Sequence, residues 1–417
     1  MASADSKQPR ELDVVVFGAT GFTGRLVSEY LHARYGGGKE LRWGIAGRSR
    51  DKLERLRDEL DGGDSMPLFV ADSRDSEALD DLTRRTRVVL STVGPYAKYG
   101  SPLVEACVRN ATDYCDLAGE VQWMRQMIDT HGDVAAASGA RIVHACGFDS
   151  VPSDIGVWFL QKEARSRFGE PLSEVTLLVR AMRGGFSGGT AASLLNVIEE
   201  TRKDRQLARQ LADPYTLNPE GLRNGPDERD QTGPAYSEHF GVWTSPFVMA
   251  VINQRIVRRS NALLDFAYGR DFRYREAVTA GPGTSGRLKA LAATAGLGGF
   301  MLASSNELLR EHVVRRLLPD PGTGPDAAAR ERGFFNLLIG GTTTDGQALT
   351  ARVTGDRDPG YGSTSRMIAE SAVCLAKDEL AVGGGFWTPA AAMGDPLLAR
   401  LEENAGLTFE ILERDVT

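Results

Sequence analysis

The chain is poor in the residues that build disulfide frameworks and metal sites. It has four cysteines (Cys107, Cys115, Cys146 and Cys374) with no C-x-x-C spacing, and its five histidines lie far apart with no H-E-x-x-H pattern. A disulfide-rich fold and a metal site are therefore not expected. Isolated, reduced cysteines are typical of a cytoplasmic protein, and we predict that location.

The chain also lacks an excess of positive charge. Its formal net charge of −7 argues against a nucleic-acid partner held through phosphate contacts. Residues 1–10 are polar and lack the apolar core of a signal peptide.

One uncharged segment, residues 290–306, is short and rich in glycine for a membrane-spanning helix. We expect a helix there that is buried or lies at a subunit interface. A homodimer is therefore one possible assembly. The alternative is an apolar surface that meets an acyl chain or makes a peripheral membrane contact.

The sequence does contain a glycine motif between a strand and a helix near its start. Residues 12–17 are mostly β-branched, and apolar residues recur at helical spacing after the motif Gly18-Ala19-Thr20-Gly21-Phe22-Thr23-Gly24. In this context Gly18 allows a tight turn, Gly21 lets the backbone approach a pyrophosphate, and Gly24 lets the helix pack close to the strand. We therefore predict that Gly18, Thr20, Gly21, Phe22, Thr23 and Gly24 bind a dinucleotide. A glycine turn without a ligand is the weaker interpretation.

An acidic residue is missing where proteins that bind NAD usually carry one. After the predicted strand 41–46 the chain reads Gly47-Arg48-Ser49-Arg50, with no carboxylate before Asp51. Arg48 and Ser49 offer the cation and the hydroxyl donor that a 2′-phosphate needs. We predict NADP as cofactor, with Asp72 near the adenine and Gly94-Pro95 beside the nicotinamide ribose.

Strands and helices alternate through about residue 145, which is typical of a doubly wound Rossmann domain. Beyond this point the sequence no longer alternates regularly between strands and helices. It predicts a strand at 174–182, a helix at 191–211, an irregular segment at 213–234 and a hairpin formed by 334–339 and 349–355. A helical pattern at 363–380 predicts a helix that is long enough to bring the chain back to the first domain. The fold class is therefore α/β, with a Rossmann domain in 1–150, an α+β substrate domain in 151–360, and a C-terminal return to the first domain in 361–417.

Candidate groups for chemistry follow the predicted fourth and sixth strands. Tyr96 is the best-placed proton donor, and an aromatic that only packs against the cofactor is equally compatible with the sequence. His144 is a second catalytic candidate, although a hydrogen-bonded structural histidine is more common at a strand end. Asp149 with Ser150 is expected to cap the next helix rather than to act as an acid or base. Cys146 is expected to be a small buried residue, and Tyr361 to line the cleft.

These segments resemble the saccharopine dehydrogenase-like family, in particular its branch of trans-acting enoyl reductases from mycobacteria and relatives. The resemblance extends over most of the chain and includes residues 18–24, 46–49, 92–96, 112–120, 144–154, 258–263, 360–362 and 383–390. It implies an NADPH-dependent oxidoreductase of complex lipid biosynthesis. Its substrate would be an α,β-unsaturated acyl or polyketide thioester, presented by a polyketide synthase carrier domain.

Two alternatives stay open. One is an NADP-binding sensor or scaffold protein without catalysis, and the other is a saccharopine-type amino-acid dehydrogenase. Saccharopine carries several carboxylates, yet the segments expected at the cleft, 94–100, 147–153 and 184–190, contain a single cation, Lys98. Such a lining suits a long, weakly polar chain better. Arginines such as Arg183, Arg258 and Arg259 could still fold into the cleft.

Overall fold

The computed structural model describes residues 10–36, 40–60, 66–184, 188–314 and 322–413. Within these ranges the chain divides into two compact units. The first unit comprises Met1–Phe148, Gly322–Gly324 and Tyr361–Ala405, and the second comprises Asp149–Pro321, Pro325–Gly360 and Gly406–Thr417.

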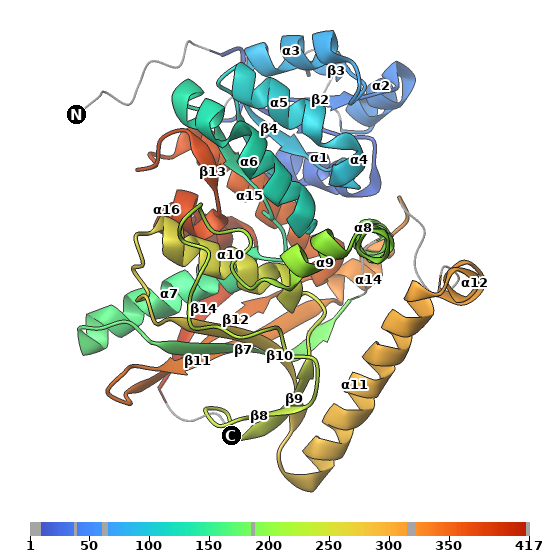
Figure 1. Cartoon of the computed structure of the whole chain (residues 1–417). Helices are drawn as coiled ribbons and strands as arrows, with labels where there is room; N and C mark the ends of the chain where they lie inside the picture. Colours follow the sequence, from blue (N-terminus) through green and yellow to red (C-terminus); the bar gives the residue numbers. More distant parts are fainter. Residues whose placement is uncertain (1–9, 37–39, 61–65, 185–187, 315–321, 414–417) are drawn as a thin grey trace. The chain divides into compact units, whose positions relative to one another are not determined.

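The first unit is built on a parallel sheet of seven strands in the order β13-β6-β5-β4-β1-β2-β3 (Figure 1). Six of these strands have the order of a doubly wound dinucleotide-binding fold, which confirms the predicted Rossmann domain. The strands are β1 (Leu12–Phe17), β2 (Trp43–Gly47), β3 (Leu68–Val70), β4 (Thr86–Ser91), β5 (Asp113–Asp116), β6 (Arg141–Val143) and β13 (Gly385–Trp387). All six residues of β1 are buried, as its continuous apolar sequence predicts.

Helices cover this sheet and include two from the C-terminal part of the chain. They are α1 (Phe22–Tyr35), α2 (Arg50–Glu59), α3 (Ser76–Arg85), α4 (Tyr96–Tyr99), α5 (Ser101–Arg109), α6 (Val121–Ser138), α15 (Thr364–Lys377) and α16 (Pro389–Asn404). The first of the C-terminal pair, α15, contacts α1, β1, β4 and β5. The C-terminal return to the first domain is thus present in the structure.

A buried carboxylate joins α15 to α1. Glu370 is fully buried and accepts hydrogen bonds from the hydroxyl groups of Tyr30 (2.6 Å) and Tyr35 (2.7 Å). Arg400 of α16 lies 3.4 Å from the same carboxylate and also forms an ion pair with Asp378. Because a buried charge needs such partners, these contacts fix the C-terminal segment against the helix that follows the glycine motif.

The second unit holds a mixed sheet of seven strands in the order β14-β12-β11-β7-β10-β9-β8. Its β7 and β10 are parallel and the other neighbours are antiparallel. The strands are β7 (Glu174–Arg183), β8 (Ala235–Ser237), β9 (Val242–Pro246), β10 (Arg273–Gly281), β11 (Phe334–Thr342), β12 (Ala348–Gly355) and β14 (Leu407–Leu412). Two helices, α7 (Val151–Phe168) and α10 (Ala250–Leu263), pack against each other. In addition, α7 packs on β11, β12 and β14, and α10 packs on β10. The remaining elements are α8 (Gly188–Lys203), α9 (Arg205–Ala212), α11 (Gly283–Ser305), α12 (Glu307–Leu309), η1 (Arg310–Val314), α14 (Ala327–Glu331) and η2 (Pro359–Ser363), the last shared with the first unit.

Two details differ from the sequence-based expectations, and a third lies partly outside the described residues. The predicted helix 191–211 is broken into α8 and α9, because the Asp204 carboxylate accepts hydrogen bonds from the N–H groups of Gln206 and Leu207 and so starts a new helix. The expected glycine loop 184–190 lies partly outside the described residues. The expected return of all of 361–417 to the first domain is wrong from Gly406 on, because β14 pairs with β12 of the second unit.

The uncharged segment 290–306 lies mainly in α11. A buried helix was one expectation for it, and that expectation is wrong, since only Gly286, Ala290 and Ser304 of α11 are buried among its described side chains. No helix in the described ranges is long and apolar enough to cross a membrane.

Candidate cofactor site

The glycine motif forms a tight turn between β1 and α1. Gly18 has a φ of +89°, a backbone conformation that residues with a Cβ rarely adopt. A Cβ added at Gly18 would lie 2.6 Å from Val93 Cγ2. An added Cβ at Gly24 would lie 2.2 Å from the Gly18 carbonyl oxygen, so only glycine allows α1 to start this close to the turn. An added Cβ at Gly21 would meet the same oxygen at 3.3 Å, a milder contact.

The N-terminus of α1 follows directly from this turn. Gly21 is the N-cap residue, and no side chain in the described ranges caps the helix. Backbone N–H groups at such a helix start, together with the helix dipole, favour a phosphate. The ring of Phe22 packs edge-on against Tyr361, with 4.7 Å between the ring centroids. Tyr361 is buried in this contact and donates a hydrogen bond to the Thr323 carbonyl (2.7 Å), so its expected place in a cleft lining is not observed.

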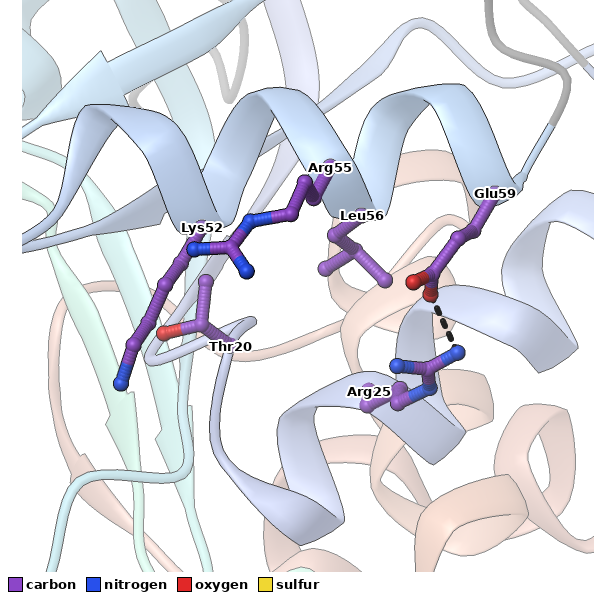
Figure 2. Close-up of a pocket in the computed structure, with 6 residues that line it drawn as sticks. All are labelled: Thr20, Arg25, Lys52, Arg55, Leu56 and Glu59. Carbon is purple, nitrogen blue, oxygen red and sulfur yellow. Dashed lines mark ion pairs between the residues drawn. The ribbon is translucent and has the colours of Figure 1, made fainter.

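A pocket of about 260 Å³ lies between α1 and α2 (Figure 2). It is lined by Thr20, Arg25, Lys52, Arg55, Leu56 and Glu59. Figure 2 shows Lys52 and Arg55 extending from α2 on the same side as Thr20, while Arg25 is neutralised by an ion pair with Glu59. Lys52 forms no hydrogen bond or ion pair with a described residue, and Arg55 donates only to the backbone carbonyl of Asp51 (3.1 Å). The pocket therefore presents two cations without a carboxylate partner.

The predicted 2′-phosphate ligands stand at the entrance of α2. Ser49 is the N-cap residue of α2, yet its hydroxyl makes no capping hydrogen bond. Arg48 precedes it, is exposed, and makes no ion pair with a described residue. Lys52 and Arg55 lie three residues apart in α2, which is the spacing of one helical face, and Arg48 precedes that helix. The spacing of Lys52 and Arg55 is visible in the sequence, although neither residue was among the predicted cofactor ligands.

Asp72 lies where the chain leaves β3. It is half-buried, and its Oδ1 accepts a hydrogen bond from the Arg74 N–H (2.9 Å) in the turn before α3. The next acidic residue, Asp75, caps α3 by accepting from the Ala78 N–H (3.1 Å). One carboxylate oxygen of Asp72 is thus committed to the turn.

The loop after β4 contains Gly94, Pro95 and Tyr96, and the Gly94–Pro95 peptide bond is cis. Tyr96 begins α4 and is buried. Its hydroxyl donates to the Ser91 carbonyl (3.0 Å) and accepts from the Leu117 N–H (3.1 Å). Burial raises the pKa of this hydroxyl well above its ordinary value. These contacts commit the hydroxyl to the loop, as a structural tyrosine would.

A second carboxylate holds the same loop. Glu120 is fully buried, and its two oxygens accept hydrogen bonds from the backbone N–H groups of Tyr96 (2.7 Å) and Ala97 (3.0 Å). The Tyr96 ring also stacks on Trp123 of α6, with 5.4 Å between centroids. Glu120 lies in the stretch 112–120 that resembles the family, but no pattern in the sequence indicates this role.

His144 follows β6 and forms a buried pair with Asp116 at the end of β5. The Asp116 carboxylate lies 2.7 Å from His144 Nδ1, and it also accepts from the N–H groups of Ala118 (3.0 Å) and Ala145 (3.1 Å). His144 Nε2 is buried without a hydrogen-bond partner in the described part of the chain. The rings of Trp123 and Phe386 lie 5.0 and 5.7 Å from the imidazole. Cys146 is buried and reduced.

In the second unit, the arginines Arg258 and Arg259 of α10 are buried in their own chain. Arg258 forms an ion pair with Asp227 (2.5 Å) and donates to the Tyr274 carbonyl (2.9 Å), and Arg259 donates to the Leu217 carbonyl. These arginines therefore hold the irregular segment 213–234 in place. Arg183 is exposed on β7.

Two buried carboxyl groups lie near the start of α7 and on β10. Glu276 accepts hydrogen bonds from the Asn253 amide (2.8 Å) and the Tyr274 hydroxyl (2.8 Å), and its burial raises its pKa to about 7. Burial also raises the pKa of Asp149 to about 6. Of the expected pair Asp149 and Ser150, Ser150 is the N-cap residue of α7, but its hydroxyl donates to the Asn253 side-chain oxygen (3.2 Å) and makes no capping hydrogen bond.

The donor set of the first unit fits a phosphorylated dinucleotide. It combines a glycine cradle, an uncapped helix start, and the cations Lys52 and Arg55, which have no acidic partner among the described residues, close to the place where an NAD-binding protein carries a carboxylate. Among the described residues, no group of three or more His, Cys, Asp or Glu side chains could hold a metal ion.

Comparisons with known proteins agree with this geometry. Residues 14–143 match the family of the saccharopine dehydrogenase NADP binding domain, which establishes NADP as the cofactor. The chain is 45% identical to a putative trans-acting enoyl reductase of Mycobacterium tuberculosis, over 96% of this chain and 98% of that protein. It is 39% identical to a trans-acting enoyl reductase of Mycobacterium ulcerans, over 95% and 97%. Among solved structures, apo saccharopine dehydrogenase from Saccharomyces cerevisiae aligns over 96% of this chain and 99% of that one, with a TM-score of 0.52 and 13% identity. That last likeness shows the fold alone.

Proposed function

Because the chain belongs to the saccharopine dehydrogenase-like family, in the branch of the trans-acting enoyl reductases, we propose that it reduces the double bond of an α,β-unsaturated acyl or polyketide thioester with NADPH. The observation that carries the proposal is a cofactor site whose cations Lys52 and Arg55 have no carboxylate partner among the described residues, in a chain that aligns with these relatives over almost its whole length. The word trans-acting in their names supports a substrate presented by a separate synthase. We assign that role to a polyketide synthase carrier domain.

Each part of the first unit has a task in holding the cofactor. The turn from Gly18 to Gly24, including Thr20, Phe22 and Thr23, binds the pyrophosphate at the start of α1. Arg48, Ser49, Lys52 and Arg55 bind the 2′-phosphate, since guanidinium and ammonium groups form charge-assisted hydrogen bonds to phosphate oxygens. Asp72 lies toward the adenine, and Gly94 and Pro95 lie beside the nicotinamide ribose.

When bound, NADPH supplies the hydride that the β-carbon of the unsaturated thioester accepts. Negative charge then develops on the thioester oxygen, and the α-carbon takes up a proton. Tyr96 positions the loop after β4, since its hydroxyl is already committed to Ser91 and Leu117. His144 keeps one ring nitrogen without a partner, and Asp116 orients the other. We therefore assign the proton donor to His144.

The buried arginines weaken the amino-acid dehydrogenase alternative. Binding saccharopine requires cations that are available to its carboxylates, and Arg258 and Arg259 are used by Asp227 and by backbone carbonyls of their own chain. The yeast saccharopine dehydrogenase shares the fold at 13% identity, which carries no argument about substrate.

Two parallel assays test the proposal with the purified full chain. One follows NADPH consumption with a medium-chain 2-enoyl thioester and confirms the saturated product by mass spectrometry. The other follows reduction of NADP with saccharopine. We expect turnover in the first assay only. Turnover of saccharopine alone, or binding of NADPH without turnover of any enoyl thioester, including one loaded on a carrier domain, would overturn the assignment.

A further inference from the structure

One side of the helix α11 is apolar and exposed along most of its length. Leu288, Leu291 and Leu302 are 63%, 56% and 75% exposed. At about 100° per residue, these three leucines lie within about 60° of one another around the helix axis. The helix also contacts β9 and β10, and its few buried residues lie on nearly the opposite side from the leucines. Exposed leucines are ordinary when they are scattered, but three on one face of one helix form a patch.

This patch offers no group for a hydrogen bond. We name it the α11 face, and it consists of the exposed residues Leu288, Leu291, Ala295, Gly298 and Leu302. Over residues 290–303 the only hydroxyl, amide or charged side chain is that of Thr294, and its oxygen is buried. A protein–protein interface carries about one hydrogen bond per 100–200 Å². The α11 face is therefore poorly suited to a specific protein partner.

Cations stand at one end of the α11 face. Arg287 and Lys289 precede and follow Leu288, so they project about 100° to either side of it around the helix. Both are exposed, and neither forms an ion pair with a described residue. Between the buried Glu276 and Glu307 the sequence contains no acidic residue. The α11 face is thus bordered by positive charge, in a chain whose formal net charge is −7.

Two aromatic side chains lie beside the same end of α11. Trp243 of β9 and Tyr236 of β8 are cross-strand neighbours whose ring centroids are 5.6 Å apart. The Arg287 guanidinium lies over the Trp243 ring, 5.3 Å from its centroid, and Tyr236 is exposed. Tryptophan and tyrosine are enriched at the boundary between lipid and water, because each ring is apolar and carries one polar group.

We propose that the α11 face rests on a membrane surface that contains anionic lipid, with its leucines among the acyl chains and Arg287 and Lys289 at the headgroup phosphates. Exposed aliphatic side chains flanked by cations are the combination by which amphipathic helices bind such surfaces. The helix lies along the membrane, because its other side contacts β9 and β10. This inference goes beyond the proposed reaction, and vesicle binding tests it without cofactor or thioester.

Two other occupants fit these observations less well. A single acyl chain binds in a concave pocket that encloses it, whereas the α11 face is the outer side of a helix. A second copy of the same face would bring two more cations and no carboxylate to the contact. An anionic membrane supplies both the apolar layer and the negative charge that the α11 face lacks.

Co-sedimentation of the purified full chain with vesicles tests the proposal. The chain should bind mixed vesicles of phosphatidylcholine and phosphatidylglycerol, and it should bind phosphatidylcholine alone about fivefold more weakly or worse. Leu302→Asp should lower the partition coefficient about tenfold or more, since it removes a leucine from the acyl layer and adds an anion. Val134→Asp makes the same charge change at a 51% exposed residue of α6 and should bind like the wild type. Circular dichroism and NADPH titration should be unchanged in both variants.

The contribution of the cations has its own pair of variants. Lys289→Gln should weaken binding to the mixed vesicles about fivefold and leave binding to phosphatidylcholine unchanged. Lys162→Gln removes an exposed lysine of α7 and should change neither. Equal weakening by both variants would show that net charge alone attracts the chain, and would overturn the assignment to the α11 face.

A fluorescent label reports which side of α11 meets the lipid. The four native cysteines are buried, so Ala295→Cys and Ala293→Cys can each carry an environment-sensitive dye. Both alanines are exposed, and they lie about 160° apart around the helix. Mixed vesicles should shift the emission of the label at 295 to the blue and leave the label at 293 nearly unchanged.

Three results would overturn the proposal. They are no binding to the mixed vesicles, equal binding of the wild type and Leu302→Asp, and equal emission shifts at the two labels. Analytical ultracentrifugation covers the remaining occupant. A wild-type chain that binds no vesicles and forms a dimer that Leu302→Asp dissolves would assign the α11 face to a protein interface instead.

Discussion

The phenolic hydroxyl of Tyr96 donates a hydrogen bond to the backbone carbonyl of Ser91 over 3.0 Å. The same oxygen accepts a hydrogen bond from the Leu117 N–H, so one side chain links the end of β4, the start of α4 and the end of β5. A hydroxyl with both partners inside the protein is poorly suited to deliver a proton to a substrate. It is well suited to fix the loop that holds Gly94 and Pro95.

Tyr96→Phe should therefore lower the free energy of unfolding and have little effect on kcat. The substitution keeps the ring on Trp123 but leaves the buried Ser91 carbonyl and Leu117 N–H without this partner, a loss of about 1–3 kcal/mol in the free energy of unfolding. We expect kcat to stay within a few-fold of the wild-type value. Urea unfolding and steady-state kinetics measure the two effects.

Tyr99→Phe is the matched control, since it removes a hydroxyl from the same short helix α4. It should change neither stability nor kcat. A Tyr96→Phe protein of unchanged stability whose kcat falls about 100-fold would return Tyr96 to the role of proton donor.

Removing either cation of the α2 pocket should weaken NADPH and spare NADH. Lys52→Ala and Arg55→Ala each remove a charge that faces Thr20 in Figure 2. A charge-assisted hydrogen bond to phosphate contributes about 1.5–3 kcal/mol, so we expect the Kd for NADPH to rise about tenfold or more in each variant. Arg48→Ala should raise the Kd for NADPH by a similar factor. Titration of nicotinamide fluorescence with both cofactors measures the difference.

Arg50→Ala supplies the control for this series. Arg50 belongs to the same helix and is exposed, but it lies 3.7 Å from the Glu54 carboxylate and does not line the pocket. Its loss should leave the ratio of the two Kd values unchanged. If Lys52→Ala and Arg55→Ala weaken NADPH and NADH equally, the pocket does not hold the 2′-phosphate.

His144→Asn should lower kcat with little change in the Kd for NADPH. A positioned general acid contributes about 10²–10⁴-fold, so a fall of about 100-fold or more is expected if His144 delivers the proton. Asp116→Asn should lower kcat in the same direction, because it removes the charge that orients the imidazole. Single-turnover kinetics separates the chemical step from binding. Full kcat in His144→Asn would leave the histidine a structural role.

Glu276 should make the stability of the chain depend on pH. Burial raises its pKa from an ordinary value of 4.5 to about 7, so the folded state holds a proton that the unfolded state releases between these values. Stability should therefore fall as the pH rises from about 4.5 to 7, by roughly 3 kcal/mol for a shift of this size. Urea unfolding at pH 5 and pH 8 measures the difference.

Glu276→Gln removes the titrating group and keeps its shape. Its free energy of unfolding should change less between pH 5 and pH 8 than that of the wild type. Asp345→Asn, in an exposed turn of the β11–β12 hairpin, should leave the wild-type dependence intact. An identical pH dependence in the wild type and Glu276→Gln would show that Glu276 is already ionised in the folded state.

Much of the first unit could be predicted from the sequence because its signals are local. Leu12–Phe17 is apolar throughout, three glycines follow at fixed spacing, and the strand and helix patterns then alternate with short turns. The strand β13 could not be predicted. It has only three residues, and it joins the sheet through its pairing with β6, about 240 positions earlier in the chain.

The second unit was predicted less well for the same reason. The helix α10 carries buried Arg255, Arg258 and Arg259, and charged residues in a sequence predict a solvated face. They are buried because carboxylates and carbonyls from the irregular segment 213–234 pair with them. Such long-range pairing leaves no periodic signal in the sequence. Lys52 and Arg55, in contrast, had a local signal, because they lie three residues apart in the predicted helix.

The distance along the chain between Phe148, where the first part of the first unit ends, and α15 has a consequence for synthesis on the ribosome. About 215 residues separate Phe148 from Thr364, where the helix that covers β1, β4 and β5 begins. At about 5–20 residues per second, translation of that interval takes roughly 10–40 s. During this time the nascent sheet lacks α15, and Tyr30 and Tyr35 lack Glu370. A chain terminated anywhere in the interval is therefore released with its nucleotide-binding sheet unfinished, although every residue of the glycine motif has already been made.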